Sequence, residues 1–249
     1  MDTLKTLLNH KTIRRYTPRN ISEDTLQQIL EAATRGSTTG NMQLYSILVT
    51  RDQEMKEKLA PFHFNQAMAT SAPVILTFCA DSNRFSKWCQ FRNAEPGYDN
   101  MQVFMWGVID AIIAAQNACI AAEALGLGIC WLGTITFNAQ NFIEILKLPK
   151  LVVPVACITL GYPDETPELT DRLPVEAVIH SETYFDYDLD RINTLYKIKE
   201  NLESTKRLLE ENQLPNLAQI FTEKRYKKAD NEFFSEKFME VLKNQGFLM

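Results

Sequence analysis

One segment limits the folds open to this chain more than any other. VFMWGVIDAIIAAQNACIAAEALGLG, residues 103–128, is the longest apolar run in a chain of 249 residues, and a run of this length could span a membrane. Polar side chains interrupt it at Asp110, Gln116, Asn117 and Glu123. Because such side chains are costly in lipid, we expect a buried helix that Gly126 and Gly128 terminate. The helix would lie in a core or against a second subunit, and Ala114 and Ala118 would allow a partner helix to approach closely.

The rest of the chain up to about residue 161 alternates between two hydrophobic patterns. Short apolar, β-branched runs predict strands at 46–50, 73–81, 129–134 and 152–163. Amphipathic spacing predicts helices at 2–10, 22–36, 51–62, 81–93 and 139–148. Ser22 and Asn138 stand where two of these helices need an N-cap. The alternation predicts a sheet core, of the α/β or the α+β class, with helices on its faces.

Beyond residue 185 the sequence becomes charged and helical. Residues 185–213 predict charged helices, and residues 233–247 predict a final helix. Charged side chains are seldom buried, so this part is too polar to build a large core of its own. We therefore expect a core of residues 1–185 and a C-terminal helical extension of residues 186–249.

Composition argues against several classes of function. The formal net charge of −5 does not suit a general nucleic-acid-binding protein. Five cysteines occur, an odd number without a C-x-x-C pair, so we expect free thiols in a reducing compartment. The three histidines, at positions 10, 63 and 180, are too scattered to predict a metal site. The N-terminus lacks the apolar region of a secretory signal, and we expect a cytoplasmic location.

Three polar stretches are candidates for ligand binding. HKTIRRYTP, residues 10–18, holds several cations and a hydroxyl donor, a set that suits a phosphate. A solvated basic loop is the alternative interpretation of this stretch. RGSTTGNMQ (35–43) and LTDRLP (169–174) offer further hydrogen-bonding groups. The chain has no G-x-G-x-x-G after a strand, no P-loop and no G-x-S-x-G elbow, so neither a Rossmann site nor a triad hydrolase is indicated.

The order of these motifs resembles one known family. Segments similar to the FMN-dependent nitroreductase family are HKTIRRYTPRNISEDTLQQILEAA, GSTTGNMQ, AAQNACIAAEALGLGICWLG and ITLGYPDETPELTDRLP. The resemblance covers roughly residues 1–175, and it depends on the order and spacing of the motifs together. The C-terminal part, which ends in EKFMEVLKNQGF, resembles the larger branch of NADPH-dependent nitro and flavin reductases.

The resemblance implies a fold and an assembly. The fold is of the α+β class, with a mostly antiparallel central sheet flanked by helices and a C-terminal helical extension. The chain is expected to form a homodimer with FMN sites at the subunit interface, so that residues 103–125 become the dimer core. Its other partners would be small-molecule acceptors, with no nucleic acid, membrane or metal.

The resemblance also assigns the residues that would bind FMN. His10, Lys11 and Thr12 would lie at the phosphate. Arg14 would reach the N1/C2 edge of the ring, where a cation stabilises the charge of the reduced ring. The other assignments are Thr38, Thr39, Asn41 and Gln43 along the ring edge, Gln66 at the pyrimidine edge, Trp131, Leu132, Gly133 and Thr134 near N5, and Arg172 at the phosphate.

Two positions depart from the family pattern. Thr170 stands where the family often has a lysine, so one charge partner of the phosphate is missing or comes from elsewhere. Thr134 follows Gly133 where the family often has a second glycine. The side chain of Thr134 is expected to reduce the space for a substrate over the ring.

The implied activity is hydride transfer from NAD(P)H to N5 of FMN, followed by transfer from FMN to an acceptor that binds in the same place. This is a ping-pong mechanism, and it requires no catalytic residue of the protein. Nitroaromatic, quinone, azo and flavin acceptors suit this chemistry. Lys224, Arg225 and Lys227 are expected to favour NADPH by pairing with its 2′-phosphate, or else form a solvated turn. The alternatives are an FMN storage or sensor protein without useful turnover, and a dimer without a cofactor.

Overall fold

The structure is a computed structural model that describes residues 3–248. The chain divides into two units. Unit 1 comprises Met1–Glu168 and Phe234–Met249, and unit 2 comprises Leu169–Phe233. This division differs from the one expected from sequence, which placed a single boundary after residue 185.

The end of the final helix explains the difference. Its side chains are apolar enough to join the core of unit 1, where Val241, Leu242 and Phe247 are buried. The ring of Phe247 lies 5.2 Å from that of Phe104, centroid to centroid. The charged residues before this helix suggested a separate extension, so the sequence did not predict that the end of the chain packs in unit 1.

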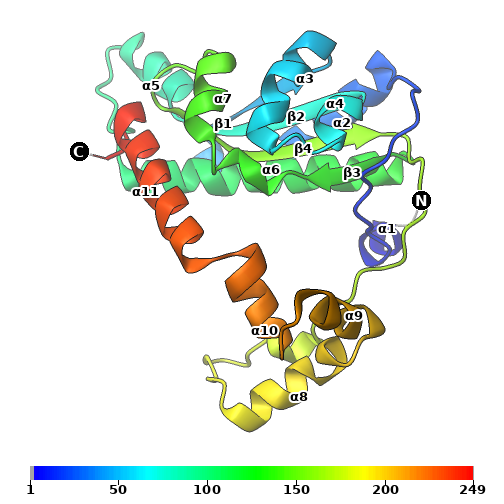
Figure 1. The fold of residues 1–249 in the computed structure, drawn as a ribbon. Helices are drawn as coiled ribbons and strands as arrows, with labels where there is room; N and C mark the ends of the chain where they lie inside the picture. Colours follow the sequence, from blue (N-terminus) through cyan, green and yellow to red (C-terminus); the bar gives the residue numbers. More distant parts are fainter. Residues whose placement is uncertain (1–2, 249) are drawn as a thin grey trace. The chain divides into compact units, whose positions relative to one another are not determined.

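Unit 1 is built on a four-stranded antiparallel sheet in the order β1-β2-β4-β3 (Figure 1). Its strands are β1 Tyr45–Thr50, β2 Val74–Asp81, β3 Gly128–Trp131 and β4 Val152–Gly161. The expected α+β class with an antiparallel sheet is confirmed. β3 is shorter than expected, because the chain leaves the sheet after Trp131 and forms the 3-10 helix η3, Gly133–Ile135.

One face of the sheet is covered by α6, Met101–Ala124 (Figure 1), and α2, Glu23–Thr34, packs with α6 in the core on this face. The α6 helix follows the long apolar segment of the sequence and ends, as expected, just before Gly126, whose φ of +82° suits a glycine. Gly107 allows α6 to approach the sheet closely, since a Cβ at this position would lie only 2.9 Å from the carbonyl oxygen of Leu44.

The opposite face is covered by shorter helices. They are α3 Gln53–Leu59, η2 Ala60–His63, α4 Met68–Ser71 and α7 Ala139–Ile145. Their side chains meet the alternate residues of the strands, among them Ile75, Cys130 and Cys157. Because both faces are covered, β2 is buried along its whole length. The core of unit 1 therefore consists of two layers of helices around one sheet.

The two expected helix caps have different outcomes. Ser22 caps α2 as expected, because its Oγ accepts a hydrogen bond from the N–H of Thr25 at 3.2 Å. The prediction for Asn138 is wrong. This residue precedes α7, but its side-chain amide donates to the carbonyl oxygen of Phe62 at 2.9 Å and does not cap the helix.

The sequence suggested that the alanines of α6 face a partner subunit, but in the structure they do not. Ala114 is 1% exposed and Ala118 is fully buried, and both pack in the core of unit 1. A different stripe of α6 is exposed and apolar, with the spacing of one helical face: Met101, Met105, Ile109 and Ile112. Three leucines of α1, Thr3–Leu8, are also exposed: Leu4, Leu7 and Leu8.

By length and composition alone, α6 could cross a membrane. Half of its most apolar window is buried inside the structure. The polar interruption at Asp110 has a structural use, because its buried carboxylate accepts hydrogen bonds from two backbone N–H groups of a neighbouring loop. These contacts are those of a core helix.

Unit 2 contains helices, as expected for the extension. They are α8 Leu189–Glu200, α9 Glu203–Asn212, α10 Leu217–Gln219 and the π-helical turn η5 Ile220–Arg225, and α11 Lys228–Gln245 crosses into unit 1. Arg191 holds the entry to α8. Its guanidinium donates to the carbonyl oxygen of Phe185 at 2.7 Å and lies over the ring of Tyr187.

The five cysteines are free thiols and all are buried: Cys79, Cys89, Cys119, Cys130 and Cys157. Burial raises the pKa of Cys119 and that of Cys157 to about 12, because the thiolate loses its hydration inside the core. These side chains therefore act as small apolar residues of the core.

Candidate functional site

The basic stretch near the N-terminus lies along the free edge of β3. Thr12 forms a parallel bridge with Ile129, and the N–H of Ile13 donates to the carbonyl oxygen of Ile129 at 2.9 Å. The same parallel register, two residues further along both segments, places Arg14 level with Trp131. The structure therefore brings together two of the segments that were assigned to FMN from sequence.

The segment after β3 carries unused hydrogen-bond donors. Leu132 is anchored, since its N–H donates to the carbonyl oxygen of Cys157 at 2.8 Å. The N–H groups of Gly133 and Thr134 donate to no acceptor among residues 3–248. A Cβ at Gly133 would meet no atom within 4 Å. Two free donors thus follow Trp131 in the chain, close to the level of Arg14, and the space beside Gly133 is open.

A buried histidine joins this segment to a third one. The Nδ1 of His63 lies 2.7 Å from the hydroxyl of Thr134. His63 ends the η2 turn, and the N–H of Gln66 donates to its carbonyl oxygen at 3.2 Å. Gln66 is therefore held near the segment 131–134, in keeping with its assigned place at the same ligand. Its side chain forms no hydrogen bond among the described residues and is available.

The position of Thr134 changes one expectation. This side chain is only 7% exposed, and its hydroxyl faces His63 inside the protein. It packs in the core and does not project over open space. The expectation that Thr134 reduces the space for a substrate is therefore revised.

His10 and Lys11 lie at the N-terminal start of the same edge. The Nδ1 of His10 is 2.6 Å from a carboxylate oxygen of Glu123, near the end of α6. Because a carboxylate only accepts hydrogen bonds, Nδ1 carries the proton of this contact, and Nε2 remains available. Lys11 lines a small cavity of about 220 Å³ together with Glu123 and Lys5.

The loop that contains Thr38, Thr39, Asn41 and Gln43 is ordered by Asp110. One carboxylate oxygen of Asp110 accepts from the N–H of Thr39 at 2.8 Å, and the other accepts from the N–H of Leu44 at 3.0 Å. Asn41 and Gln43 have positive φ angles and hydrogen-bond each other, side chain to side chain, at 3.0 Å. The loop therefore has a defined shape before any ligand binds.

The structure does not gather this loop with the other candidate residues in one chain. The loop is anchored at Asp110 and His10 is anchored at Glu123, and both anchors belong to α6. They are 13 residues apart, which at 1.5 Å per residue is about 20 Å along the helix. The loop also leads into β1, at the edge of the sheet opposite to β3, along which the basic stretch lies.

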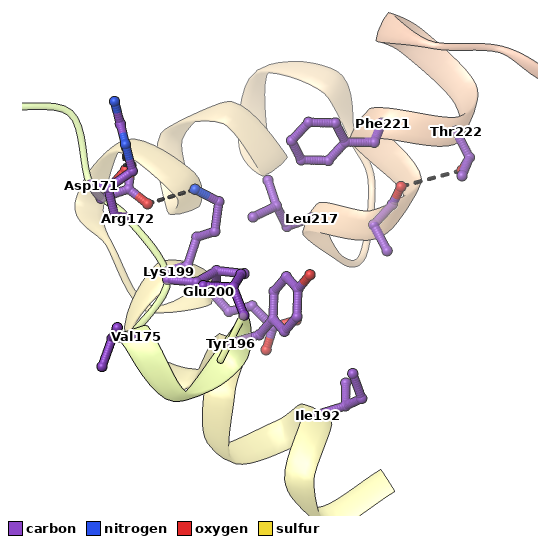
Figure 2. A pocket seen from close by; sticks show the side chains of 13 residues that line it. Asp171, Arg172, Val175, Ile192, Tyr196, Lys199, Glu200, Leu217, Phe221 and Thr222 are labelled. Atoms are coloured by element: carbon purple, nitrogen blue, oxygen red, sulfur yellow. Dashed lines mark hydrogen bonds and ion pairs between the residues drawn. The ribbon is translucent and has the colours of Figure 1, made fainter. Parts of the chain in front are cut away.

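Arg172 belongs to unit 2, so its place relative to the other candidates stays a prediction. Its guanidinium donates to the backbone carbonyls of Thr170 and Asp171, at 3.3 and 3.0 Å. Arg172 also lines a largely apolar cavity of about 1010 Å³ within unit 2 (Figure 2). Lys199 and Asp171 form an ion pair of 2.5 Å at the edge of this cavity, and Tyr196, Leu217 and Phe221 lie around it (Figure 2).

The basic cluster of unit 2 is exposed. Arg225 lies over the ring of Phe221 and lines a second cleft, of about 410 Å³. Lys199 and Arg207 line the same cleft, together with two hydroxyl side chains. Lys224 and Lys227 are not among its lining residues. Two acidic residues, Asp171 and Glu211, line the cleft as well, and Asp171 pairs with Lys199. Arg207 and Arg225 are therefore the cations of the cleft that an anion could use, and Arg225 is the member of the predicted set that lines it.

Sequence reasoning missed four residues that hold the candidates in place. They are His63, Asp110, Glu123 and Glu165, whose carboxylate accepts from the backbone of Arg14. Two of them carried a signal, because Asp110 and Glu123 interrupt the long apolar run. A polar residue that a buried helix retains usually has a partner. Nothing in the sequence marks His63 or Glu165 in this way.

Comparisons with known proteins identify the family of the chain. The Nitroreductase family matches residues 7–162. An FMN reductase (NAD(P)H) of Bacillus subtilis strain 168 is 35% identical over 189 residues, which are 75% of this chain and 76% of that protein. The crystal structure of an oxidoreductase from Bacteroides fragilis is 52% identical, with a TM-score of 0.96 over 100% of both chains. The NADPH:FMN oxidoreductase of Vibrio harveyi, solved in complex with NAD+, is 28% identical, with a TM-score of 0.83 over 99% of both chains. From its sequence and its fold, this chain belongs to the nitroreductase family.

Proposed function

We propose that this chain is an FMN-dependent oxidoreductase. It takes hydride from NAD(P)H, with NADPH favoured, and passes it to nitroaromatic, quinone, azo or flavin acceptors by a ping-pong mechanism. The observation that carries the proposal is the pair of free N–H groups at Gly133 and Thr134, which follow the level of Arg14 on the sheet edge and have open space beside Gly133.

These groups fit the edge of a flavin. Bound FMN supplies a ring that accepts and releases hydride, and its N5 is a hydrogen-bond acceptor when oxidised. The backbone donors of Gly133 and Thr134 would orient that edge. The guanidinium of Arg14 would lie at the N1/C2 edge, where it stabilises negative charge in a site that excludes water. The half-buried side chain of Gln66 would bind the pyrimidine edge.

The phosphate end would be bound by the start of the basic stretch. His10, Lys11 and Thr12 offer an imidazole nitrogen, an ammonium and a hydroxyl along one short segment. Charge-assisted hydrogen bonds to phosphate are about twice as strong as neutral ones. Arg172 is the remaining candidate for the phosphate.

Two copies of the chain are proposed to share each site. Because the loop of residues 38–43 leads into β1, at the edge of the sheet opposite to β3 and Arg14, the loop would serve the ring bound by a second copy. The exposed stripe of α6, which includes Ile109 at 48% exposure, offers an apolar surface for that contact. Leu7 and Leu8 of α1 add to this surface. These two observations together support the proposed homodimer.

The preference for NADPH is proposed to come from unit 2. The 2′-phosphate is the only charged group that distinguishes NADPH from NADH, and the cleft of Arg225 offers cations and hydroxyls to such a group. We include Lys224 and Lys227 in this role, because they are close in sequence to Arg225 and add positive charge. The buried free thiols suit a reducing compartment, which supports a cytoplasmic location.

One experiment separates this function from an FMN storage or sensor protein. The purified protein is loaded with FMN and mixed with NADPH or NADH without oxygen, and the loss of its yellow absorbance is followed. We expect fast bleaching with NADPH, slower bleaching with NADH, and recovery of colour when a quinone or nitroaromatic is added. Parallel lines in double-reciprocal plots would then establish the ping-pong order. A yellow protein that neither coenzyme bleaches would be a storage or sensor protein, and a protein that never retains FMN would contradict both.

A further inference from the structure

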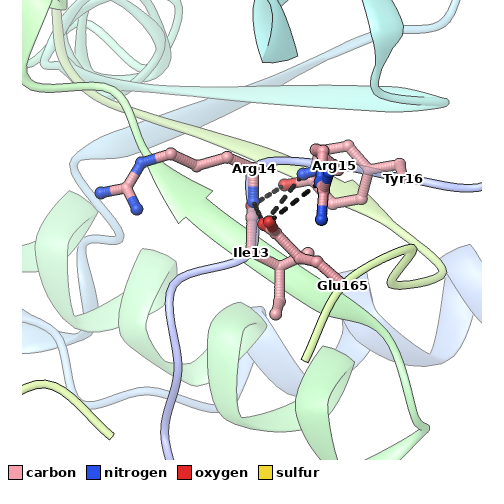
Figure 3. Close-up of polar contacts among 5 residues, drawn as sticks. All are labelled: Ile13, Arg14, Arg15, Tyr16 and Glu165. Carbon is pink, nitrogen blue, oxygen red and sulfur yellow. Dashed lines mark hydrogen bonds and ion pairs between the residues drawn. The ribbon is translucent and has the colours of Figure 1, made fainter. Parts of the chain in front are cut away.

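Glu165 connects the loop after β4 to the backbone of the basic stretch (Figure 3). One of its carboxylate oxygens accepts from the N–H of Arg14 at 2.5 Å and from the N–H of Arg15 at 3.0 Å. The other accepts from the Nε of Arg15 at 3.2 Å. The side chain of Glu165 is only 19% exposed. A single carboxylate therefore fixes two consecutive backbone groups of the stretch.

The two arginines use their charges differently. Arg15 pairs with Glu165, whereas the guanidinium of Arg14 extends away from this carboxylate (Figure 3). Among residues 3–248, the Arg14 side chain has no ion pair or hydrogen bond with the protein. The carboxylate that binds the backbone of Arg14 is thus already paired with the side chain of Arg15. Arg14 keeps its full charge for a ligand.

Other hydrogen bonds hold the same stretch, but none reaches the N–H of Arg14. Tyr16 donates from its hydroxyl to the carbonyl oxygen of Ile13 at 2.7 Å, and the N–H of Asp164 donates to the carbonyl oxygen of Arg15 at 3.0 Å. These contacts locate the segment on the edge of the sheet. The peptide group between Ile13 and Arg14 is held at both ends, by Tyr16 at its carbonyl oxygen and by Glu165 at its N–H, and among the described residues Glu165 is the acceptor of that N–H. The Arg14 N–H, followed by the contacts from Arg15, holds the pKa of Glu165 below its usual range, so the carboxylate stays ionised at neutral pH.

We propose that Glu165 is a positioning residue for Arg14. By binding the backbone of Arg14 and the side chain of Arg15, it aims the Arg14 guanidinium at an anionic edge of the bound cofactor and keeps it unpaired. This inference rests on the proposed function, since the ligand of Arg14 is the flavin ring edge. Glu165 itself touches neither the cofactor nor a substrate.

The sign of the effect makes the proposal testable. Glu165 is an acid close to a site for an anion, so its charge alone repels FMN and disfavours the reduced ring. Removing it should then tighten FMN binding and make the reduction potential of the flavin more positive. Loss of a positioning residue predicts the reverse, weaker binding and a more negative potential, because a misplaced Arg14 no longer stabilises the reduced ring.

The experiment compares Glu165→Ala with Glu168→Ala in the FMN-loaded, full-length protein. Glu168 is exposed, belongs to the same loop and has no partner among the described residues, so its removal reports the loss of one negative charge. FMN affinity is measured by fluorescence quenching in the apoprotein, and the flavin potential by equilibration with a reference dye. We expect FMN to bind Glu165→Ala roughly three- to tenfold more weakly than the parent, the range for one lost hydrogen bond. Glu168→Ala should bind FMN as the parent does or slightly more tightly.

A double substitution shows whether the effect passes through Arg14. Arg14→Ala should weaken FMN binding and lower the potential, and Glu165→Ala should add nothing to it in Arg14→Ala/Glu165→Ala, because the group that it positions is already gone. Glu165→Gln keeps an oxygen for the two backbone donors and should restore most of the affinity. It also supplies the comparison if the alanine variant does not fold.

The outcomes separate the inference from the function on which it rests. If Arg14→Ala shifts affinity and potential but Glu165→Ala behaves like Glu168→Ala, the positioning role is overturned and the role of Arg14 stands. Additive effects in the double variant would also overturn the positioning role. If Arg14→Ala changes neither quantity, the proposed site of Arg14 is wrong, and the inference fails with it.

Discussion

The Nδ1 of His63 lies 2.7 Å from the hydroxyl of Thr134, across the layer that covers one face of the sheet. The imidazole is fully buried, with its Nε2 3.8 Å from the sulfur of Cys157 and its ring 4.7 Å from that of Phe142. This contact ties the turn before Gln66 to the segment that carries the free N–H groups. Two parts of the proposed flavin site are therefore held by one neutral side chain.

The pH dependence of stability should report this histidine. Burial lowers the pKa of His63 from 6.5 to about 4, because the imidazolium would lose its hydration. Between these two values the unfolded chain binds a proton that the folded chain does not. Stability is therefore fully present above pH 6.5 and falls as the pH decreases towards 4, by on the order of 3 kcal/mol for this group.

The comparison that isolates this group is His63→Gln, which cannot titrate but can still bond to Thr134. We expect the difference in unfolding free energy between parent and variant to shrink as the pH falls from 6.5 to 4, in urea titrations at each pH. A difference that is constant over this range would show that His63 is not the titrating group.

Substitution of Thr134 should separate its hydroxyl from its bulk. Thr134→Val keeps the shape but leaves Nδ1 of His63 buried without a partner, which typically costs about 1–3 kcal/mol. Thr134→Ser keeps the hydroxyl and serves as the matched control, with a smaller loss of stability. Thermal unfolding of both variants checks this order, and a serine variant less stable than the valine variant would contradict it.

The exposed stripe of α6 should control assembly. Ile109→Glu places a charge in the proposed subunit contact, where it would be desolvated without a partner. We expect at least a tenfold weaker dimer, equivalent to about 1.4 kcal/mol, and a loss of bound FMN. Light scattering over a dilution series, with FMN absorbance, measures both.

Gln53→Glu, on the exposed surface of α3, adds the same charge and should leave the dimer unchanged. Ala114→Glu is not a test of assembly, because Ala114 is buried in the core of its own subunit and its substitution should unfold unit 1. A parent protein that is monomeric and retains FMN would refute the shared site.

Coenzyme preference should depend on Arg225. Replacing Arg225 and Lys227 with alanine is expected to raise the KM for NADPH by roughly tenfold or more, the value of a charge-assisted contact, and to leave the KM for NADH nearly unchanged. Arg225→Ala alone should give most of this effect, since Arg225 lines the cleft and Lys227 does not. Added salt should weaken the use of NADPH more than that of NADH. Equal responses of the two coenzymes would exclude the cleft as the 2′-phosphate site.

Hydrophobic periodicity predicted most of the fold of unit 1 because burial there is continuous. The runs at 46–50, 73–81 and 152–163 became β1, β2 and β4 with small changes at their ends. The face of α6 could not be predicted in this way. A helix that is apolar on every side carries no periodic signal, so its alanines and its exposed stripe of larger residues look alike in sequence.

The candidate site was predictable only where its residues lie in one short motif. His10, Lys11, Thr12 and Arg14 are adjacent in sequence, and the fold keeps them on one edge. The groups that hold them are distant: Glu165 is 151 positions from Arg14, and His63 is 71 positions from Thr134. Pairings over such distances depend on the tertiary fold, and local patterns contain no information about them.

The buried thiols have a consequence for the lifetime of the catalyst. Quinones are electrophiles that attack thiolates, and reduction of nitroaromatics also yields reactive products. Burial keeps Cys79, Cys119, Cys130 and Cys157 out of reach and raises their pKa values, so the nucleophilic form is scarce at neutral pH. An enzyme that handles such acceptors is thereby protected from its own chemistry, and alkylation of cysteine should not limit its number of turnovers.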